Sequence, residues 1–534
     1  MVKYTLKYLL VFIVTICCVN ITVAQKKTKV QMLNSNYIRS DKNIAEGARR
    51  LIGDVVFKQD STIMKCDSAY FYSEQNMFEA FGSVHLYKVG DKTVDIKSNF
   101  LRHNGNTKMA QFRKNVVMSD TKVVLYTDSL DYDIKRDIGY YEDGAKIVDS
   151  ATTLTSLKGH YYHHTNEIFF KKNVVVVNNE GEYEMYTDTL KYNTKKEIAY
   201  FLGPTEFFND TNYMYSEFGW YNTTNNKAFF KKKAIYKNQK QSLTADSLYY
   251  DRDLEHGIAY SNVVVTDTAQ NLIIKGNYLE VFEDTERLLV TDKALLIHII
   301  EGDSLFLHAD TIISEFDTSG VHRTFKAFYH TRIYKSNLQA QTDSLFFSMF
   351  DSVLQFHGSP VFWAEKYQIT ADYIEAFIID DKLNRFKLYN GGLIVSQQDS
   401  THFNQIKGTE MTGFMKNNAL TKIDVYKKSE TISFPFDEYG ILGANKGKSG
   451  NITIMLKENK ISRIIYRQTY EGKMHPLADL TPKEMVVRDF VWLENIRPKS
   501  PEDVFKWEDK PISETKGSRL KGRTSSSKAK NDSE

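Results

Sequence analysis

A short motif returns along this sequence at a nearly constant interval, and that repetition constrains the fold more than any other feature. The motif is a small residue, Asp, a hydroxyl residue, an apolar residue and then aromatics, as in Thr127-Asp128-Ser129-Leu130-Asp131-Tyr132. Four of its aspartates, Asp67, Asp128, Asp188 and Asp246, follow one another at intervals of 61, 60 and 58 residues. A fixed period of this kind predicts a repeat architecture, in which each unit buries its apolar face against its neighbours.

Each copy of the motif alternates like a half-buried β-strand. Leu130 and Tyr132 lie two residues apart and share one face, whereas Ser129 and Asp131 lie on the other. Runs of four to six β-branched and aromatic residues, bounded by Asn, Asp and Gly, predict short strands rather than helices. The motif Asp is predicted to lie at the strand entrance, where its carboxylate caps a turn. The apolar-face positions, which are the candidate groove residues, are Leu130, Tyr132, Leu190, Tyr192, Leu248, Tyr250, Leu345 and Phe347.

The two ends of the chain differ from this repeat. Residues 1–24 have a basic start, an apolar stretch and small residues before Gln25, which predict a secretory signal peptide; the alternative is a retained membrane anchor. Only two of the eight prolines precede residue 430, and proline is rare inside sheets. We therefore expect a β-repeat region over 25–430, with two or more stacked modules, an α+β segment over 431–509, and a disordered polar tail over 510–534. Thr481-Pro482-Lys483-Glu484 predicts a helix start.

The sequence shows no catalytic constellation, so we expect a protein that is not an enzyme and that needs no cofactor. The net charge of +3 argues against a nucleic-acid binder. His160, His163 and His164 suggest a metal site, but a surface cluster of histidines is the favoured interpretation. The lysines of Lys171-Lys172 and Lys231-Lys232-Lys233 are either a basic rim for lipid phosphates or, as we favour, soluble exposed turns.

A sheet with one apolar face must cover that face. It can close on itself, pack against a second sheet, or fold over and enclose a groove. The third arrangement suits a lipid carrier, because each CH₂ group removed from water contributes about 0.8 kcal/mol. A groove lined by Leu, Val, Phe and Tyr shields acyl chains without specific polar chemistry.

Two segments carry a resemblance to a known family. Phe81-Gly82-Ser83-Val84-His85-Leu86 and Asn115-Val116-Val117-Met118, together with the motif and the exported leader, resemble the OstA-like proteins of Bacteroidetes. These are relatives of the lipopolysaccharide-transport protein LptA and of the periplasmic domain of LptD. The resemblance covers about residues 30–430. It implies an all-β, repeat-built elongated β-jellyroll, or β-taco, of many short antiparallel strands.

The same resemblance implies a function and partners. We expect a periplasmic, outer-membrane-associated protein that shields the lipid A acyl chains of lipopolysaccharide and contributes to outer-membrane assembly. Its expected partners are lipopolysaccharide, other lipopolysaccharide-transport envelope proteins bound through sheet edges, and further copies of itself bound head to tail. The alternative is a structural β-solenoid, or an outer-membrane-associated scaffold or adhesin, without lipid cargo.

Overall fold

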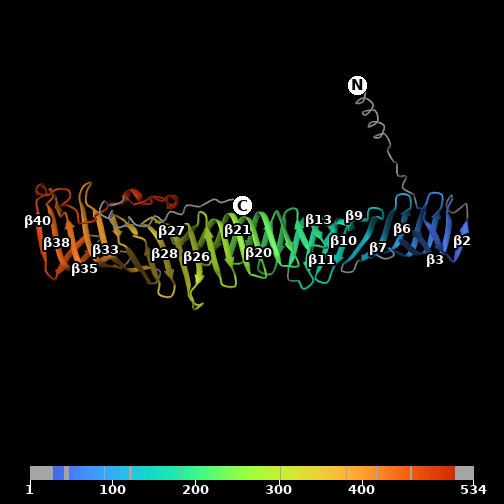
Figure 1. Cartoon of the computed structure of the whole chain (residues 1–534), viewed down its shortest axis with the longest axis horizontal. Helices are drawn as coiled ribbons and strands as arrows, with labels where there is room; N and C mark the ends of the chain where they lie inside the picture. The colour runs from blue at the N-terminus through green and yellow to red at the C-terminus, as the bar shows by residue number, and fades with distance from the viewer. Residues whose placement is uncertain are drawn as a thin grey trace, which may run out of the picture. The chain divides into compact units, whose positions relative to one another are not determined.

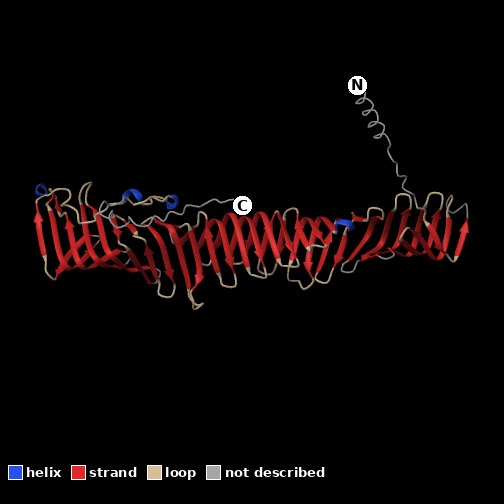
Figure 2. Ribbon diagram, viewed as in Figure 1, coloured by secondary structure: helices blue, strands red, loops and turns tan. Residues whose placement is uncertain are grey.

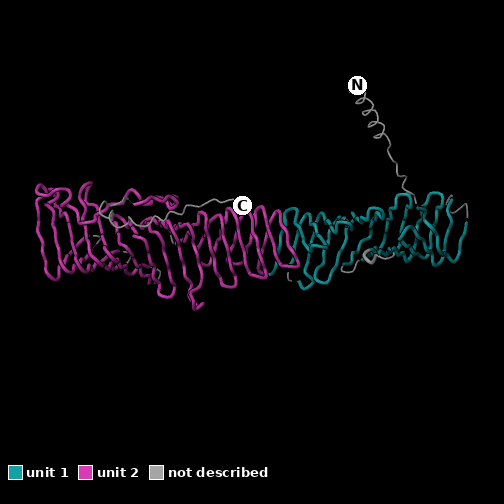
Figure 3. Tube along the Cα trace, in the orientation of Figure 1, with its two compact units in different colours: residues 1–210 teal, residues 211–534 magenta. Residues whose placement is uncertain are grey.

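The chain divides into two compact units, Met1–Asp210 (unit 1) and Thr211–Glu534 (unit 2), which Figure 3 colours separately. The predicted signal peptide and the polar tail from residue 511 onward lie outside the described residues. The computed structural model describes residues 28–40, 47–88, 91–119, 123–181, 183–300, 302–379, 382–416, 419–457 and 460–510.

Unit 1 is built from antiparallel strands, most of which pair with the next strand in the sequence (Figure 1). Its alternating apolar and polar residues favour strands, and Asn, Asp and Gly favour the turns between them. Its elements are β1 (Gln31–Asn34), β2 (Tyr37–Ser40), β3 (Arg49–Gln59), β4 (Thr62–Tyr72), β5 (Met77–Lys88), β6 (Asp91–Asn104), β7 (Met109–Ser119), β8 (Val124–Asp133), β9 (Ile138–Tyr141), β10 (Ala145–Val148), β11 (Thr152–Ser156), β12 (Lys158–Tyr162), the 3-10 helix η1 (His163–Thr165), β13 (Glu167–Asn178), β14 (Glu184–Asn193), β15 (Ile198–Phe201) and β16 (Thr205–Phe208).

Unit 2 follows the same plan of successive antiparallel pairs. Its elements are β17 (Tyr213–Ser216), β18 (Phe218–Asn222), β19 (Lys227–Lys237), β20 (Gln241–Asp251), β21 (His256–Asp267), β22 (Leu272–Phe282), β23 (Arg287–Thr291), β24 (Leu295–Ile300), β25 (Asp303–His308), β26 (Thr311–Phe316), β27 (Arg323–Lys335), β28 (Leu338–Ser348), β29 (Val353–His357), β30 (Val361–Ala364), β31 (Tyr367–Thr370), β32 (Tyr373–Ile379), β33 (Lys382–Gln397), β34 (Phe403–Lys416), β35 (Ala419–Ser433), β36 (Phe436–Asp437), β37 (Gly440–Ile441), β38 (Ala444–Lys457), β39 (Lys460–Arg467), β40 (Glu471–His475), and the 3-10 helices η2 (Leu477–Asp479), η3 (Glu494–Ile496) and η4 (Pro501–Phe505).

The all-β prediction is confirmed, because strands dominate both units and helix in the described residues is limited to short 3-10 turns (Figure 2). The expected α+β character of residues 431–509 is wrong. Strands continue past residue 430 to His475. Only half of a capping box forms at the predicted helix start. The Thr481 backbone N–H donates to Glu484 Oε2 at 2.9 Å, but the Glu484 N–H donates to the Thr481 carbonyl and not to its hydroxyl. This start closes a single turn only, because the chain after Glu484 is drawn out along the sheet.

Every second long strand bends in the middle, where two consecutive residues have positive φ. In β5 these are Gly82 (φ 71°) and Ser83 (φ 40°), and in β7 they are Lys114 (φ 67°) and Asn115 (φ 51°). The pairing register shifts at both bends, as expected for β-bulges. Because both halves stay in the ladder, β8 has 10 residues and β33 has 16, so the expected lengths of four to six residues are wrong for the long strands. They are correct for shorter ones, such as β9 with four residues and β12 with five.

We call this bend the crease, and the two halves of the sheet that meet at it arm A and arm B. Arm A holds the apolar and aromatic positions of the motif, and arm B holds the strand halves on the other side of the crease. Side chains of the two arms meet in the interior: Phe57 of arm B stacks on Phe78 of arm A with ring centroids 4.1 Å apart. In unit 2, Phe356 and Phe362 meet across the arms at 4.6 Å. Each unit is therefore a sheet folded over on itself, with a mouth opposite the crease.

The motif aspartates lie at the crease, beside the bend of the neighbouring strand. Ser83 Oγ donates to Asp67 Oδ2 at 3.0 Å, and Asn262 Nδ2 donates to Asp246 Oδ2 at 2.9 Å. A Cβ atom at Gly82 would collide with the Asp67 carboxylate, so this bend requires glycine. The aspartate thus has a structural, capping role, but it lies in the middle of its strand and not at the predicted entrance.

The last described segment, residues 477–510, runs along the outer face of arm B in unit 2, and we call it the strap. Its Val487 packs with Leu393 and Val395, which alternate along β33 with Ile394 of the interior cluster. Its Leu493 joins a second buried cluster on the same outer face. In Figure 1 the strap is the red segment near β27 and β33.

Candidate functional site

The eight groove residues predicted from the sequence lie in four equivalent strands, β8, β14, β20 and β28. Those of β8 belong to the interior core of unit 1, and Leu345 belongs to that of unit 2. The structure does not join the eight into one pocket, because each strand contributes its pair at a different place along the interior. Leu130, Tyr132, Leu190 and Leu345 are buried, and Tyr192, Leu248, Tyr250 and Phe347 are half-buried.

The aromatic member of each pair packs on its cross-strand partner. Tyr132 lies opposite Gly139, and Tyr250 lies opposite Gly257. A Cβ atom at Gly139 would come within 3.3 Å of the Tyr132 ring, so the ring occupies the space that a larger partner would fill. Such pairs fix the register of the hairpin, and their side chains fill the interior.

In unit 1 the mouth is closed by an ion pair between the two arms. Lys88, at the arm B end of β5, lies 2.5 Å from Asp137, which follows β8 at the end of arm A. The Tyr132 hydroxyl donates to the same carboxylate. The side chains of Lys88 and Asp137 are only 13% and 8% exposed. We call these three residues the clasp.

Further contacts close the same unit nearer its N-terminal end. Gln59 of arm B donates to the Gly105 carbonyl of arm A at 2.8 Å, and its Oε1 lies 2.8 Å from Nε2 of His103. Lys108 and Asp60 pair across the mouth at 2.5 Å. The interior behind these contacts is filled by side chains, since the large residues Phe57, Phe78 and Phe112 are fully buried there.

The buried His103 makes the stability of unit 1 depend on pH. Burial lowers the pKa of His103 to about 4, because the charged ring would lose its hydration. An unfolded histidine titrates near 6.5, so the stabilisation is complete above that pH and is lost as the pH falls from about 6.5 towards 4. We expect unit 1 to lose about 2 kcal/mol of unfolding free energy between pH 7 and pH 5 from this group. Urea unfolding at the two pH values measures the loss.

The matched variant is His103→Gln, which keeps a hydrogen-bonding side chain but cannot titrate. The loss between pH 7 and pH 5 should be smaller in this variant by the same amount. Equal losses in the variant and the unmodified chain would show that the pH dependence has another source.

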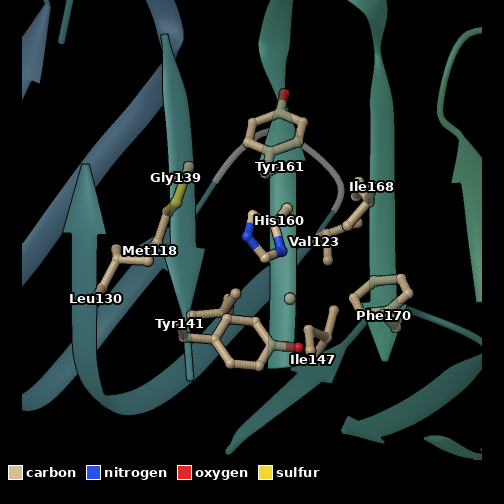
Figure 4. A pocket seen from close by; sticks show the side chains of 12 residues that line it. Met118, Val123, Leu130, Gly139, Tyr141, Ile147, His160, Tyr161, Ile168 and Phe170 are labelled. Carbon is tan, nitrogen blue, oxygen red and sulfur yellow. The ribbon is translucent and has the colours of Figure 1, made fainter. Parts of the chain in front are cut away.

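Beyond the clasp, unit 1 contains a small cavity of about 60 Å³. Figure 4 shows its side chains, among them Leu130, Tyr141 and Phe170, grouped around the space between neighbouring strands. The Tyr141 hydroxyl lies 2.6 Å from Ser156 Oγ, and burial raises the pKa of Tyr141 to about 12, so the ring stays neutral. An engineered apolar cavity that binds benzene measures about 150 Å³. This cavity is therefore too small for an acyl chain in the observed conformation.

The interior of unit 2 is open towards its mouth. Val263 and Leu279, beside the crease, are each 1% exposed, whereas Val265 and Val281, two residues nearer the mouth, are half-buried. Small buried residues such as Ala259 lie beside the crease. Apolar residues that are half-buried along this interior include Leu243, Leu248, Val265, Leu272, Val281, Leu288, Leu305, Phe325 and Leu354.

Several of these residues escape prediction from the motif alone, because they lie in arm B or in strands without the motif. Leu243 precedes the motif of β20, and Leu272 belongs to a strand with only a weak copy. The alternation of apolar and polar residues could have identified them if it had been followed across the crease. The extra residue of the β-bulge must then be counted, because it shifts the alternation by one position.

The three clustered histidines do not converge on one point. The His160 ring stacks on Tyr140 at 5.8 Å, and His163 Nδ1 lies 3.0 Å from the Tyr161 hydroxyl. No group of three or more His, Cys, Asp or Glu side chains in the described residues is placed to hold a metal ion. Likewise, none of the helices in that part of the chain has the length and apolar character needed to cross a membrane.

The two lysine runs lie at the crease and not at the mouth. Lys172 and Lys232 have φ angles of 65° and 61° at the bends of β13 and β19. Lys233 pairs with Glu217 at 2.7 Å on the exposed outer side. They are thus remote from the interior that the half-buried apolar residues line.

Part of the chain matches a known family. The family model described as OstA-like protein matches the chain twice, over residues 27–185 and 179–246. Among solved structures, the chain is similar to LptH of Pseudomonas aeruginosa, described as the LptA-homologous periplasmic component of a lipopolysaccharide transport device. The identity is 11%, the alignment covers 26% of this chain and 95% of that one, and the TM-score is 0.21. None of the curated proteins matches the chain.

Proposed function

We propose that this chain, an OstA-like protein over residues 27–246, binds and transports lipopolysaccharide in the periplasm and thereby contributes to outer-membrane assembly. The observation that carries the proposal is the row of half-buried apolar side chains along the interior of unit 2. An exposed acyl chain costs about 0.8 kcal/mol for each CH₂ group, and this lining would remove that cost along the length of the chain. The description of LptH as part of a lipopolysaccharide transport device agrees with this role.

Among the eight predicted groove residues, the half-buried four are proposed to touch the acyl chains. Tyr192, Leu248, Tyr250 and Phe347 would contact lipid directly, while Leu130, Tyr132, Leu190 and Leu345 would form the wall behind them. The wedge-shaped interior would favour this division, because small residues fill the crease and larger ones stand nearer the mouth.

Photo-crosslinking tests the proposal in cells that make lipopolysaccharide. A photoreactive amino acid at Leu248 should attach to lipopolysaccharide, because this side chain faces the open interior. At Tyr249, which points to the opposite face of the same strand, labelling should be at least about tenfold weaker. Equal labelling at both positions, or none at either, would contradict the carrier role.

A scaffold without cargo remains the second candidate, and the filled interior of β3–β8 in unit 1 favours it there. Leu130 is 1% exposed behind the clasp, so it should give no lipopolysaccharide adduct while the clasp is closed. If labelling is absent at Leu248 as well, the scaffold role would apply to both units.

The edges of the sheet are proposed to receive partners. In the described residues β1 and β2 pair with β3 alone, and their side chains are mostly exposed. Unpaired strand edges bind further strands by β-augmentation. We propose that other lipopolysaccharide-transport envelope proteins, or a second copy of the chain, pair there.

A further inference from the structure

The strands of arm A in unit 2 end in a row of turns along the mouth, which we call rim A. Neighbouring turns are bonded through their backbones. The Met349 N–H donates to the Arg323 carbonyl at 3.1 Å, and the Ile378 N–H donates to the Ser352 carbonyl at 2.9 Å. The backbone that carries the side chains of these turns is therefore fixed by hydrogen bonds.

Over β26–β33, rim A presents large apolar side chains to solvent. Val321 is 66% exposed, Met349 58%, Phe350 72% and Ile379 55%. Phe350 also contacts the ring of His322 on the neighbouring turn, with centroids 5.0 Å apart. Single exposed apolar residues are common, but a contiguous row on successive turns marks an interaction surface.

The opposite rim of the same strands, rim B, is polar. Its turns carry Ser336 and Asn337, and then Glu365 and Lys366, all exposed. Apolar exceptions occur outside these strands: Ile299 and Ile300 at the end of β24 are 47% and 37% exposed, and Phe436, Tyr439 and Leu442, between β35 and β38, are 63%, 90% and 57% exposed. Solubility favours polar turns on both rims equally. The apolar turns of rim A over β26–β33 therefore need another explanation.

Basic side chains lie over aromatic rings just behind the turns of rim A. The Arg323 guanidinium lies 4.6 Å from the centre of the Phe316 ring, and that of Arg385 lies 4.4 Å from the Phe377 ring. On the next hairpin, Lys422 Nζ lies 4.9 Å from the Phe414 ring. Two of these cations are also ion-paired, Arg323 with Glu286 at 2.7 Å and Lys422 with Asp424 at 2.6 Å. The rim is thus layered, with apolar tips outermost and cation–aromatic pairs behind them.

This layering matches the interface of a lipid membrane. Apolar tips suit the upper acyl region, while aromatic rings and the charged ends of Arg and Lys suit the level of the glycerol and phosphate groups. A protein partner would need an apolar surface of matching shape, but would not require cation–aromatic pairs behind the tips of three hairpins.

We propose that rim A of unit 2 docks onto a phosphate-bearing lipid membrane, with Val321, Met349, Phe350 and Ile379 inserted into its interfacial layer. Docking in this orientation places the open mouth of unit 2 against the membrane surface. The inference goes beyond the proposed function, since membrane docking does not require that the interior carry lipid.

Site-specific crosslinking to vesicles tests the docking. The full chain, with a photoreactive amino acid at Phe350, is mixed with vesicles of phosphatidylethanolamine and phosphatidylglycerol that contain a traceable phospholipid. We expect phospholipid adducts at Phe350 and at least about tenfold fewer at Asn337 on rim B. Because both proteins carry the same N-terminal leader, the difference reports the rim and not the leader.

A pair of double variants supplies the matched control. M349S/F350S should reduce adducts from a probe at Val321 about tenfold or more, whereas I299S/I300S, which removes exposed apolar residues from rim B, should leave them unchanged. Circular dichroism melts identify any variant that has lost its fold.

Three results would overturn the proposal: equal adducts at Phe350 and Asn337, no phospholipid adduct at Phe350, or protein adducts alone at Phe350 when envelope extract is added. The lipopolysaccharide adduct at Leu248 is scored separately. Its loss would count against the carrier function, and its presence beside a negative vesicle result would count against membrane docking only.

Discussion

Replacing Lys88 by alanine should lower the unfolding free energy of unit 1 by about 3 to 5 kcal/mol, the usual cost of leaving one member of a buried ion pair alone. Asp137 would lose its lysine partner in a site where its side chain is only 8% exposed, and the His163 Nε2 atom, 3.9 Å from Asp137 Oδ2, is too far to take the place of the Lys88 ammonium. The hydrogen bond from Tyr132 would remain, but a neutral donor does not replace a cation. Urea unfolding, with hydrogen exchange of β5 and β8 as the local measure, gives the change.

The matched control is Lys108→Ala, which breaks the other ion pair across the same mouth. The side chains of Lys108 and Asp60 are 28% and 40% exposed, so this loss should be below about 1 kcal/mol. Equal effects of the two substitutions would show that the clasp contributes no more than a surface ion pair. If the clasp also excludes lipid, Lys88→Ala should create a lipopolysaccharide adduct at Leu130, where the unmodified chain gives none.

Trp363→Ala should cost unit 2 about 3 to 5 kcal/mol, because a fully buried Trp leaves a large void when truncated. Trp363 lies on the outer face of arm B and packs with Leu493 and Ile496 of the strap. The substitution should therefore loosen the strap as well as the sheet. Thermal unfolding measures the stability, and limited proteolysis measures cleavage within the strap.

Trp363→Phe is the informative control. Within the described residues the indole N–H of Trp363 has no hydrogen-bond partner, so Phe removes a buried donor at the same time as it removes volume. We expect a loss below about 1.5 kcal/mol and no new cleavage of the strap. Equal losses for Ala and Phe would show that packing volume is not what holds the strap.

The strap is held by glutamines as well as by packing. Gln368 donates to the Val491 carbonyl at 2.8 Å and accepts from the Leu493 N–H at 2.6 Å. Gln405 makes the same pair of bonds with Met485 and Val487, at 2.9 and 2.8 Å. Each buried amide thus binds the strap backbone as a neighbouring strand would, which explains why this segment is extended and not helical.

The sequence predicts the repeat and its apolar face well, because both depend on local spacing. Leu130 and Tyr132 lie on the interior face, as their two-residue separation indicates. The crease is missed because its residues, such as Lys114 and Lys232, carry side chains that seldom adopt positive φ, so composition gives no warning. A usable signal exists in the asparagines that precede Val-rich halves, since Asn115 is itself at a bend and tolerates that conformation.

The clasp and the strap are beyond prediction from spacing. Lys88 and Asp137 are 49 residues apart, and nothing near either of them in the sequence identifies the partner. The helix start predicted at Thr481 forms one turn, but no helix directly follows it in the described residues. The buried bonds from Gln405 to Met485 and Val487 outweigh the helix propensity of the residues that follow.

The crease also determines how such a protein can grow. Between Asp67 and Asp128 the chain adds β5, β6, β7 and β8, of which β5 and β7 carry the positive-φ bend, and each pairs mainly with its immediate neighbours. Duplicating one period would lengthen a folded sheet by four strand spacings, or about 19 Å, without altering its cross-section. Gene duplication in whole periods would therefore change the length of the sheet while leaving the chemistry of its lining unchanged.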